Sequence, residues 1–250
     1  MLGQFQRDGD FTVSHTAEPS STLVAGFSTP GLAGLTAVDY LVDHLNLTET
    51  GHITAEGLPA ITPFEQGRPR HHTRLFSRED LDLTALVGEL YVPPRLGGSF
   101  GDAVLDWADE HGVREVVVAA GVPVPHAPDD HRTFYVATDD YREHRLADAT
   151  VPPMGTGFLD GVNAAIMERG LGSDLEVCLL VTPVHLQAPD VEAAIRLVET
   201  LESIYGLEID ASPLQSFAAE VEAYYRDLAE RMAAQSEAEP EDVGADRMYM

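Results

Sequence analysis

The chain alternates between short runs of apolar residues and longer segments in which apolar residues recur with the period of a helix. Continuous apolar runs are typical of strands with both faces covered, and the periodic segments predict amphipathic helices. The sequence therefore predicts an α/β fold with a mixed, mostly parallel sheet flanked by helices. Strands are expected at residues 11–15, 23–27, 51–55, 73–77, 85–90, 115–120, 133–138 and 176–181.

The predicted helices are each marked by an apolar stripe, and several also by a boundary residue. Thr29 followed by Pro30 predicts a helix start, and Gly112, Gly170 and Gly206 predict helix ends. The stripes are Leu32, Leu35, Val38, Val42 and Leu45; Phe100, Ala103, Val104, Trp107 and Ala108; Phe158, Val162 and Ile166; Val191, Ala194, Ile195, Val198, Leu201 and Tyr205; and Leu214, Phe217, Val221, Tyr224 or Tyr225, Leu228 and Met232.

The last of these helices is expected to open with the capping box at residues 212–215 and to fade near Ala234. The residues that follow are acidic, include Pro240 and Gly244, and lack apolar periodicity until the final three positions. We therefore expect one α/β domain at residues 1–235 and a flexible acidic tail at 236–250.

The charge balance excludes two classes of partner. The chain holds 42 acidic residues against 15 basic ones, all of them arginine, for a net charge of −27. A field of this sign repels nucleic-acid phosphates and anionic lipid, so neither is an expected partner. Acidic residues spread along the whole chain are typical of proteins that work in molar salt, where self-repulsion is screened.

Targeting signals are not evident in the sequence. No stretch approaches the roughly 20 consecutive apolar residues of a membrane span, and the first residues lack the pattern of a signal peptide. We expect a cytoplasmic protein without a membrane partner. Cys178 is the single cysteine and lies in an apolar run, which predicts a small core residue and excludes an internal disulfide.

A glycine-rich turn at residues 26–34 follows a predicted strand and opens a helix, where backbone N–H groups can hold an anion. Ser28, Thr29 and Gly31 would form that pocket, with Glu89 and His126 near neighbouring strand ends. The segment lacks the lysine of a phosphate-binding loop and does not fit the dinucleotide fingerprint. A tight turn that packs closely at its glycines is the favoured alternative.

Metal and catalytic motifs are scarce. Residues 121–141 gather His126, Asp129, Asp130, His131, Asp139 and Asp140, but their spacing matches no known ligand pattern. We expect no metal there, nor at His71, His72 or His185. No nucleophile elbow and no zinc-protease motif is present, so no catalytic residue and no cofactor is expected.

Several stretches, taken together, resemble the proteasome assembly chaperone family as it occurs in halophilic archaea: LVAGFSTPGLAG at 23–34, GLPAITPFEQGRPRHHTRLF at 57–76, GELYVPP at 88–94, AAGVPVPH at 119–126, PPMGTGFLDG at 152–161 and VTPVHLQAPD at 181–190. The resemblance implies a three-layer α/β fold similar to that of the purine nucleoside phosphorylases, used as a binding scaffold, and a homo-oligomer. Some relatives are labelled ATP-grasp enzymes, a label that no residue of this chain supports.

The family's functional motif is a C-terminal tripeptide, hydrophobic-Tyr-any, which inserts between α subunits of the proteasome core particle. Met248, Tyr249 and Met250 match it in full. The resemblance thus implies a non-catalytic assembly chaperone or regulator that binds those α subunits. Two alternatives stay open: a phosphorylase-like or nucleosidase-like enzyme with the anion site at residues 28–34, and a homo-oligomeric structural protein without a proteasome link.

Overall fold

The computed structural model describes residues 11–56, 58, 60–125, 130–185, 189–216 and 218. The chain divides into two compact units, residues 1–211 and 212–250. The second unit is described at residues 212–216 and 218, and it is helical from Ser212, where the capping box predicts a helix start. The rest of that predicted helix and the predicted tail at 236–250 lie outside the described residues.

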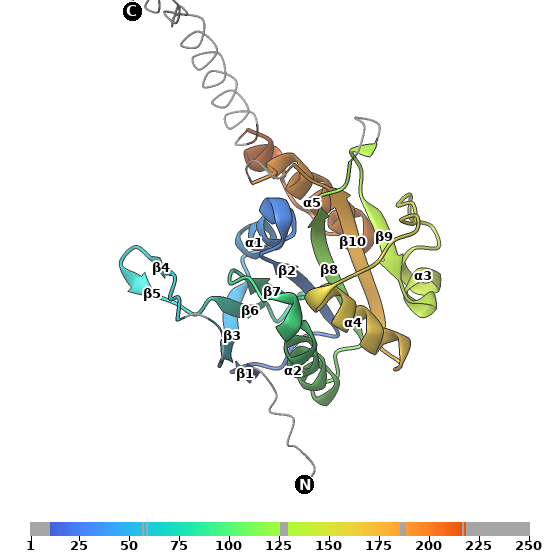
Figure 1. Ribbon diagram of the computed structural model, residues 1–250. Coiled ribbons are helices and arrows are strands. Elements are labelled where there is room, and N and C mark those ends of the chain that lie inside the picture. Colours follow the sequence, from blue (N-terminus) through green and yellow to red (C-terminus); the bar gives the residue numbers. More distant parts are fainter. Residues whose placement is uncertain are drawn as a thin grey trace, which may run out of the picture. The chain divides into compact units, whose positions relative to one another are not determined.

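Eight strands of the first unit form one sheet in the order β1-β3-β6-β7-β2-β8-β10-β9 (Figure 1). Each of them overlaps a strand predicted from the apolar runs. Their bounds are β1 Phe11–His15, β2 Thr22–Phe27, β3 Thr48–Ala55, β6 Thr73–Ser77, β7 Thr84–Gly88, β8 Glu115–Val122, β9 Phe134–Ala137 and β10 Glu176–Pro183. The short ribbon of β4 (Phe64–Glu65) and β5 (Arg68–Pro69) forms a separate sheet that the apolar pattern did not predict.

The centre and the flanks of the sheet differ in strand direction. β7, β2, β8 and β10 are parallel neighbours. β1, β3 and β6 join them through antiparallel pairs on one side, and β9 pairs antiparallel with β10 on the other. The parallel strands are the continuous apolar runs, as expected where helices cover both sheet faces.

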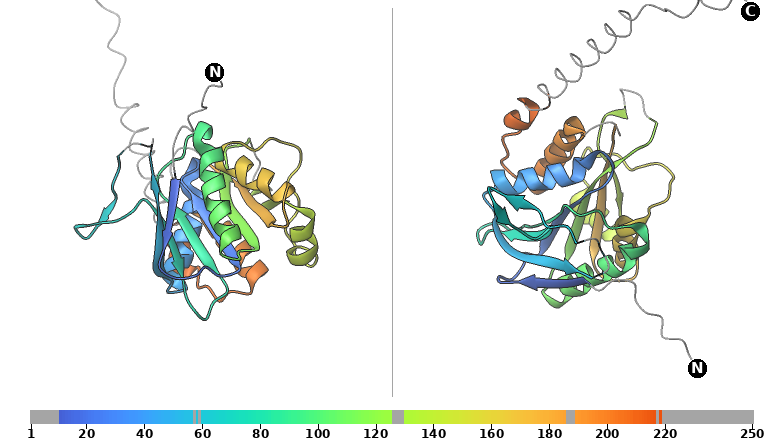
Figure 2. Two further views of the ribbon diagram at one scale, coloured as in Figure 1. Left: turned by 90° about the horizontal axis from the view of Figure 1, so that it is seen from below. Right: turned by 60° about the vertical axis from the view of Figure 1, so that its left-hand side comes forward.

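Helices cover both faces of the sheet. α1 (Ala33–His44) and α5 (Val191–Tyr205) pack together on one face, and α2 (Gly97–Glu110) and α4 (Gly161–Leu171) on the other (Figures 1 and 2). The short helix α3 (Asp139–Arg145) lies against β10, and single 3-10 turns, η1 (Pro30–Leu32) and η2 (Pro94–Leu96), precede α1 and α2. The predicted three-layer α/β fold is confirmed.

The core follows the alternation of side chains along the strands. Leu23, Ala25 and Phe27 of β2 are buried in a cluster with Phe100 and Trp107 of α2. The intervening residues of β2 face α1. Cys178 of β10 is buried as a free thiol, as predicted. Among the helices of the described part of the chain, none combines the length and apolarity that a membrane crossing needs.

Two helix starts were predicted too early. Pro30 begins the separate turn η1, and α1 begins at Ala33, because Gly31 has a left-handed φ of 70° that breaks the helix. The buried face of α1 consequently begins with the small residues Ala33, Gly34 and Ala37, whereas Leu32 and Leu35 are half-buried. Phe158 was placed on the buried stripe of α4, but it precedes that helix and is fully exposed.

Candidate functional site

The predicted ligand pocket maps to the carboxyl end of the central strands. Ser28, Thr29 and Gly31 lie in the connection from β2 to α1, and Glu89 directly follows β7. The amide of Ser28 donates to the carbonyl of Gly88 at 2.9 Å, so the two segments are neighbours. His126 lies outside the described residues. The structure therefore brings four of the five predicted residues to one end of the sheet.

Three backbone amides of this turn already have partners. Ser28 N donates to Gly88, Thr29 N donates to the carbonyl of Phe27 at 2.8 Å, and Leu32 N donates to the carbonyl of Thr29 at 2.9 Å. An anion held at the start of a helix needs free N–H groups directed at it. In this conformation these three amides offer none, so they do not form a phosphate cradle.

The glycines of the turn serve close packing. A Cβ atom at Gly34 would lie 1.9 Å from the carbonyl oxygen of Ala119, and one at Gly26 would lie 2.3 Å from the carbonyl oxygen of Gly34. The backbones of α1, β2 and β8 therefore approach each other directly. A Cβ at Gly31 would lie 2.8 Å from Cβ of Val184, a residue that directly follows β10. This geometry favours the interpretation of a tight packing turn.

Glu89 is held by two arginines. Both of its carboxylate oxygens accept hydrogen bonds from Arg70, one of them at 2.8 Å, and Nη2 of Arg74 lies 3.7 Å from Oε2. The hydrogen bond to Glu89 raises the pKa of Arg70 despite its partial burial. Arg74 itself lies over the ring of Phe76 at 4.8 Å. Glu89 thus anchors the segment before β6. A catalytic base would instead need a carboxylate oxygen that is accessible to the substrate.

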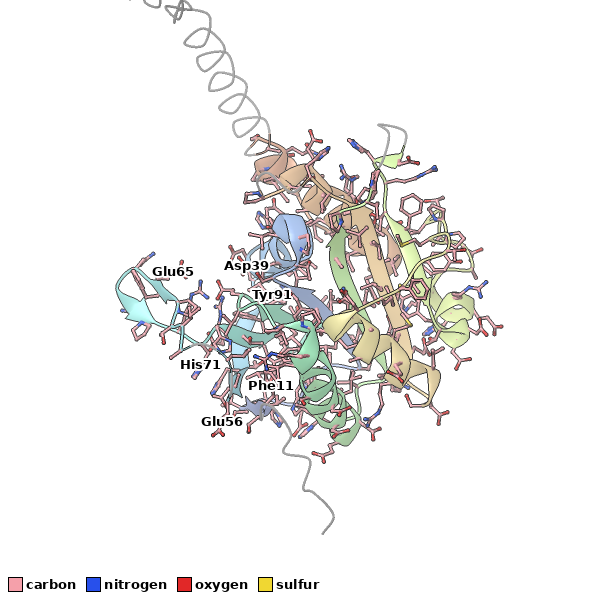
Figure 3. All side chains as sticks on the ribbon, in the orientation of Figure 1. Phe11, Asp39, Glu56, Glu65, His71 and Tyr91 are labelled. Atoms are coloured by element: carbon pink, nitrogen blue, oxygen red, sulfur yellow. The ribbon has the colours of Figure 1, made fainter. Side chains whose placement is uncertain are left out.

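A shallow hollow of about 220 Å³ opens beside Glu89. It is lined by Leu35, Thr36, Asp39, Tyr40, Asp43 and Glu89. Partial desolvation of the Asp39 carboxyl raises its pKa, and the nearby charge of Arg74 opposes this effect. Asp39 projects from α1 near the connection after β7 (Figure 3). The hollow is small and acidic, whereas small-molecule sites are usually larger and mostly apolar.

A second polar cluster, which the sequence did not predict, lies at the opposite end of β8. Glu115 is almost fully buried and accepts hydrogen bonds from Nε of Arg145 at 2.9 Å and from the hydroxyl of Tyr205. The hydroxyl of Tyr141 lies 3.1 Å from that of Tyr205, and burial raises the pKa of both phenols. Every charged group here has a partner, so the cluster ties α3 and α5 to the sheet.

The predicted partner-binding residues, Met248, Tyr249 and Met250, lie outside the described residues. The folded unit itself offers exposed apolar side chains: Ile61, Phe64, Tyr91, Val124, Phe158 and Leu171. Single exposed apolar side chains are common on folded proteins, and a contiguous patch of them would be needed to mark a contact with another protein.

These observations define the class of protein: a three-layer α/β domain in which close packing fills the turn after strand β2. The chain matches the PAC2 family over residues 23–229 and belongs to that family.

Solved structures with this fold come from archaea and bacteria. Pyrococcus furiosus PbaA, described as an archaeal homolog of proteasome-assembly chaperone, has a TM-score of 0.80 at 19% identity, covering 90% of this chain and 95% of its own. P. furiosus PbaB, described as an archaeal proteasome activator, has a TM-score of 0.76 at 20% identity, covering 88% and 99%. A Mycobacterium tuberculosis proteasome-assembly chaperone homologue has a TM-score of 0.60 at 18% identity, covering 84% and 94%. Comparison with curated proteins yields no match.

Proposed function

We propose that this protein is a non-catalytic proteasome assembly chaperone or regulator that binds the α subunits of the core particle through its C-terminal residues. The observation that carries the proposal is the tripeptide Met248-Tyr249-Met250 at the end of a PAC2-family chain. The fold it shares with PbaA and PbaB, one described as a chaperone homolog and the other as a proteasome activator, supports both roles.

The chemistry of the tripeptide suits a pocket between two subunits. Tyrosine presents a rigid apolar ring with a polar tip, and it is among the residues that most often dominate the binding energy of interfaces. The carboxylate of Met250 supplies a charge that a basic side chain of the partner can pair with. The segment before it, which is acidic and lacks apolar periodicity, provides reach if it is flexible: about 15 such residues span roughly 20 Å.

The proposal that the protein is not an enzyme is supported by the strand-end geometry. The amides of Ser28, Thr29 and Leu32 are bound to backbone carbonyls, and the carboxylate of Glu89 is bound to Arg70. A phosphorylase-like enzyme would need such groups free for its substrate. Purified protein should therefore show no phosphorolysis of nucleosides and no ATP hydrolysis above background.

We propose that the protein forms a homo-oligomer, so that several tails engage one α ring and gain avidity. Phe158, which the apolar stripe places in a core, is fully exposed in the single chain and is a candidate for the subunit interface. Phe158→Ser should shift the sedimentation coefficient toward the monomer, with Phe64→Ser, at another exposed phenylalanine, as a comparison. A wild-type chain that sediments as a monomer would contradict the oligomer.

We also propose a cytoplasmic protein of a salt-accumulating archaeon. The support is a net charge of −27 without a single lysine. Molar potassium chloride shortens the screening length to about 3 Å, so mutual repulsion of the carboxylates fades. The melting temperature should rise steeply between low salt and molar potassium chloride. A melting temperature that is flat across that range would remove this part of the proposal.

The tail proposal is tested by co-sedimentation with α subunits of the proteasome at molar potassium chloride. Deletion of residues 248–250 should abolish most of the binding and leave the thermal melt unchanged. Val243→Ala, which changes an apolar residue of the same segment outside the tripeptide, is the matched control and should bind like the wild type. Equal binding by the wild type and the deletion variant would overturn the tail mechanism.

A further inference from the structure

His15 and Glu18 meet the distant residue His111 at the end of the sheet where the parallel strands begin. His15 is the last residue of β1, Glu18 follows in the next connection, and His111 directly follows α2. One ligand atom from each of the three residues lies within 4.8 Å of the other two. β1 runs beside α2, which brings the two histidines together (Figure 1).

Both imidazoles are oriented by the same kind of hydrogen bond. Nδ1 of His15 lies 2.9 Å from the carbonyl oxygen of Ala17, and Nδ1 of His111 lies 2.7 Å from that of Trp107. A carbonyl oxygen can only accept, so Nδ1 carries the proton in each ring and the lone pair of Nε2 is left for a ligand. Histidine ligands of metals are usually oriented in this way, with the second ring nitrogen bound to a carbonyl or carboxylate.

The environment also suits an ion. The two rings meet edge to face with centroids 4.4 Å apart, and both histidines are half-buried. Glu18 is exposed, so its side chain can rotate to complete the set. Ligand atoms around tetrahedral zinc lie about 3.4 Å apart, given bonds of about 2.1 Å. Small adjustments of the three side chains, of which Glu18 is the exposed one, would bring ligand atoms that lie within 4.8 Å of one another to this spacing.

We propose that His15, Glu18 and His111 form a binding site for a divalent metal ion of the zinc class. Two imidazoles and one carboxylate are borderline-to-hard donors that suit Zn²⁺ and Cu²⁺ better than Mg²⁺, and water would fill the fourth position. A second group with similar composition, Glu115, His144 and Glu176, is different because Arg145 and Tyr205 occupy the Glu115 carboxylate.

The position of the site suggests its role. Among the strands that the structure describes, β1 lies at the edge and pairs with β3 alone, and α2 packs over it. An ion bound by His15, Glu18 and His111 would join the end of this strand to the end of that helix. Since the ion binds the folded chain, it would raise the melting temperature progressively as the free ion concentration exceeds the dissociation constant.

The single tryptophan provides a local probe. The ring of Trp107 lies 5.7 Å from that of His15 and 5.7 Å from that of His111. Copper is paramagnetic and quenches fluorescence at short range, so Cu²⁺ bound here should remove most of the Trp107 emission. The titration uses the full chain in molar potassium chloride with excess Mg²⁺, so that the acidic surface is saturated with an ion that imidazole does not favour.

The expected result is saturable quenching by Cu²⁺ and saturable heat with Zn²⁺ in calorimetry, with the affinity of His111→Gln reduced at least tenfold. His44→Gln is the matched control, because His44 also ends a helix and its Nδ1 also lies near the carbonyl oxygen four residues earlier, at 3.0 Å. It should bind both ions like the wild type. Glu18→Gln changes an exposed residue and should weaken binding without affecting the fold.

Two outcomes would overturn the proposal. One is equal affinity of the wild type and Glu18→Gln for Zn²⁺, together with unchanged copper quenching in a folded His111→Gln variant. The other is an equal loss of affinity in His44→Gln, which would indicate diffuse binding to surface histidines. Circular dichroism without metal establishes that each variant is folded.

Discussion

The turn at residues 28–34 and the histidine pair His15 and His111 stand in contrast. The turn resembles a ligand site in sequence, but the amides of Ser28, Thr29 and Leu32 donate to carbonyls, and neighbouring atoms occupy the space beside Gly31 and Gly34. The histidines belong to no motif, yet each uses Nδ1 for a backbone carbonyl, which leaves Nε2 for a ligand, and Glu18 lies close to both residues. Unoccupied donors and acceptors, more than the type of residue, therefore distinguish a binding site from a packing feature.

The sharpest test of the packing interpretation is Gly34→Ala. The new methyl group would lie 1.9 Å from the carbonyl oxygen of Ala119, and neither backbone segment can move without disturbing the sheet. We expect a loss of about 3 kcal/mol or more in the free energy of unfolding, measured by denaturant titration. A turn that opens for a ligand would accept the methyl group at little cost.

Gly98→Ala is the matched control for that variant. Gly98 also lies in the first turn of a helix, but it is exposed and a Cβ there would meet nothing within 4 Å. The exchange should be neutral or stabilise by about 0.5–1 kcal/mol, the usual gain of alanine over glycine in a helix. A similar loss in both variants would remove the argument from close backbone contact.

Glu89→Gln tests whether Glu89 serves structure. The amide can accept through one oxygen and leaves part of the Arg70 guanidinium without a partner. Since both side chains are about one quarter exposed, we expect a loss of about 1–2 kcal/mol after solvent screening. Glu65→Gln, 3.8 Å from the same arginine but largely exposed, should change stability little in the same denaturant titration. Equal stability of Glu89→Gln and wild type would contradict the anchoring role.

The smallest effect concerns a second histidine pair. His52 and His71 stack face to face at 3.6 Å, and burial, with the nearby charge of His71, lowers the pKa of His52. Below about pH 6.5 the unfolded chain binds a proton at His52 more readily than the folded chain, so stability falls on acidification. His52→Gln should make the melting temperature between pH 7 and about 5.5 less dependent on pH. Identical pH profiles for the two proteins would contradict this assignment.

The layered fold could be predicted because its central parallel strands are continuous apolar runs with polar boundaries. Elements without such a pattern were missed: the ribbon of β4 and β5 is exposed, and α3 buries one residue, Tyr141. Phe158 shows the opposite error, since helical spacing cannot tell a residue inside a helix from one just before it.

The candidate sites were harder to predict, because the fold brings together residues that are distant in the sequence. Glu115 and Tyr205 are 90 positions apart, and His15 and His111 are similarly distant. No local spacing in the sequence therefore predicts that either pair is in contact. The expectation of no metal was based on other histidines, at positions 71, 72, 126, 131 and 185. The C-terminal tripeptide, by contrast, is visible in the sequence because a short linear motif needs no fold to assemble it.

The central claim is tested most directly by the dissociation constant of Tyr249→Ala for proteasome α subunits at molar potassium chloride. Loss of an anchoring aromatic residue is worth about 2 kcal/mol, so the account predicts binding about thirtyfold weaker per engaged site than wild type. Val243→Ala should bind like the wild type, and all three proteins should melt at the same temperature. Equal dissociation constants for the wild type and Tyr249→Ala would contradict the account.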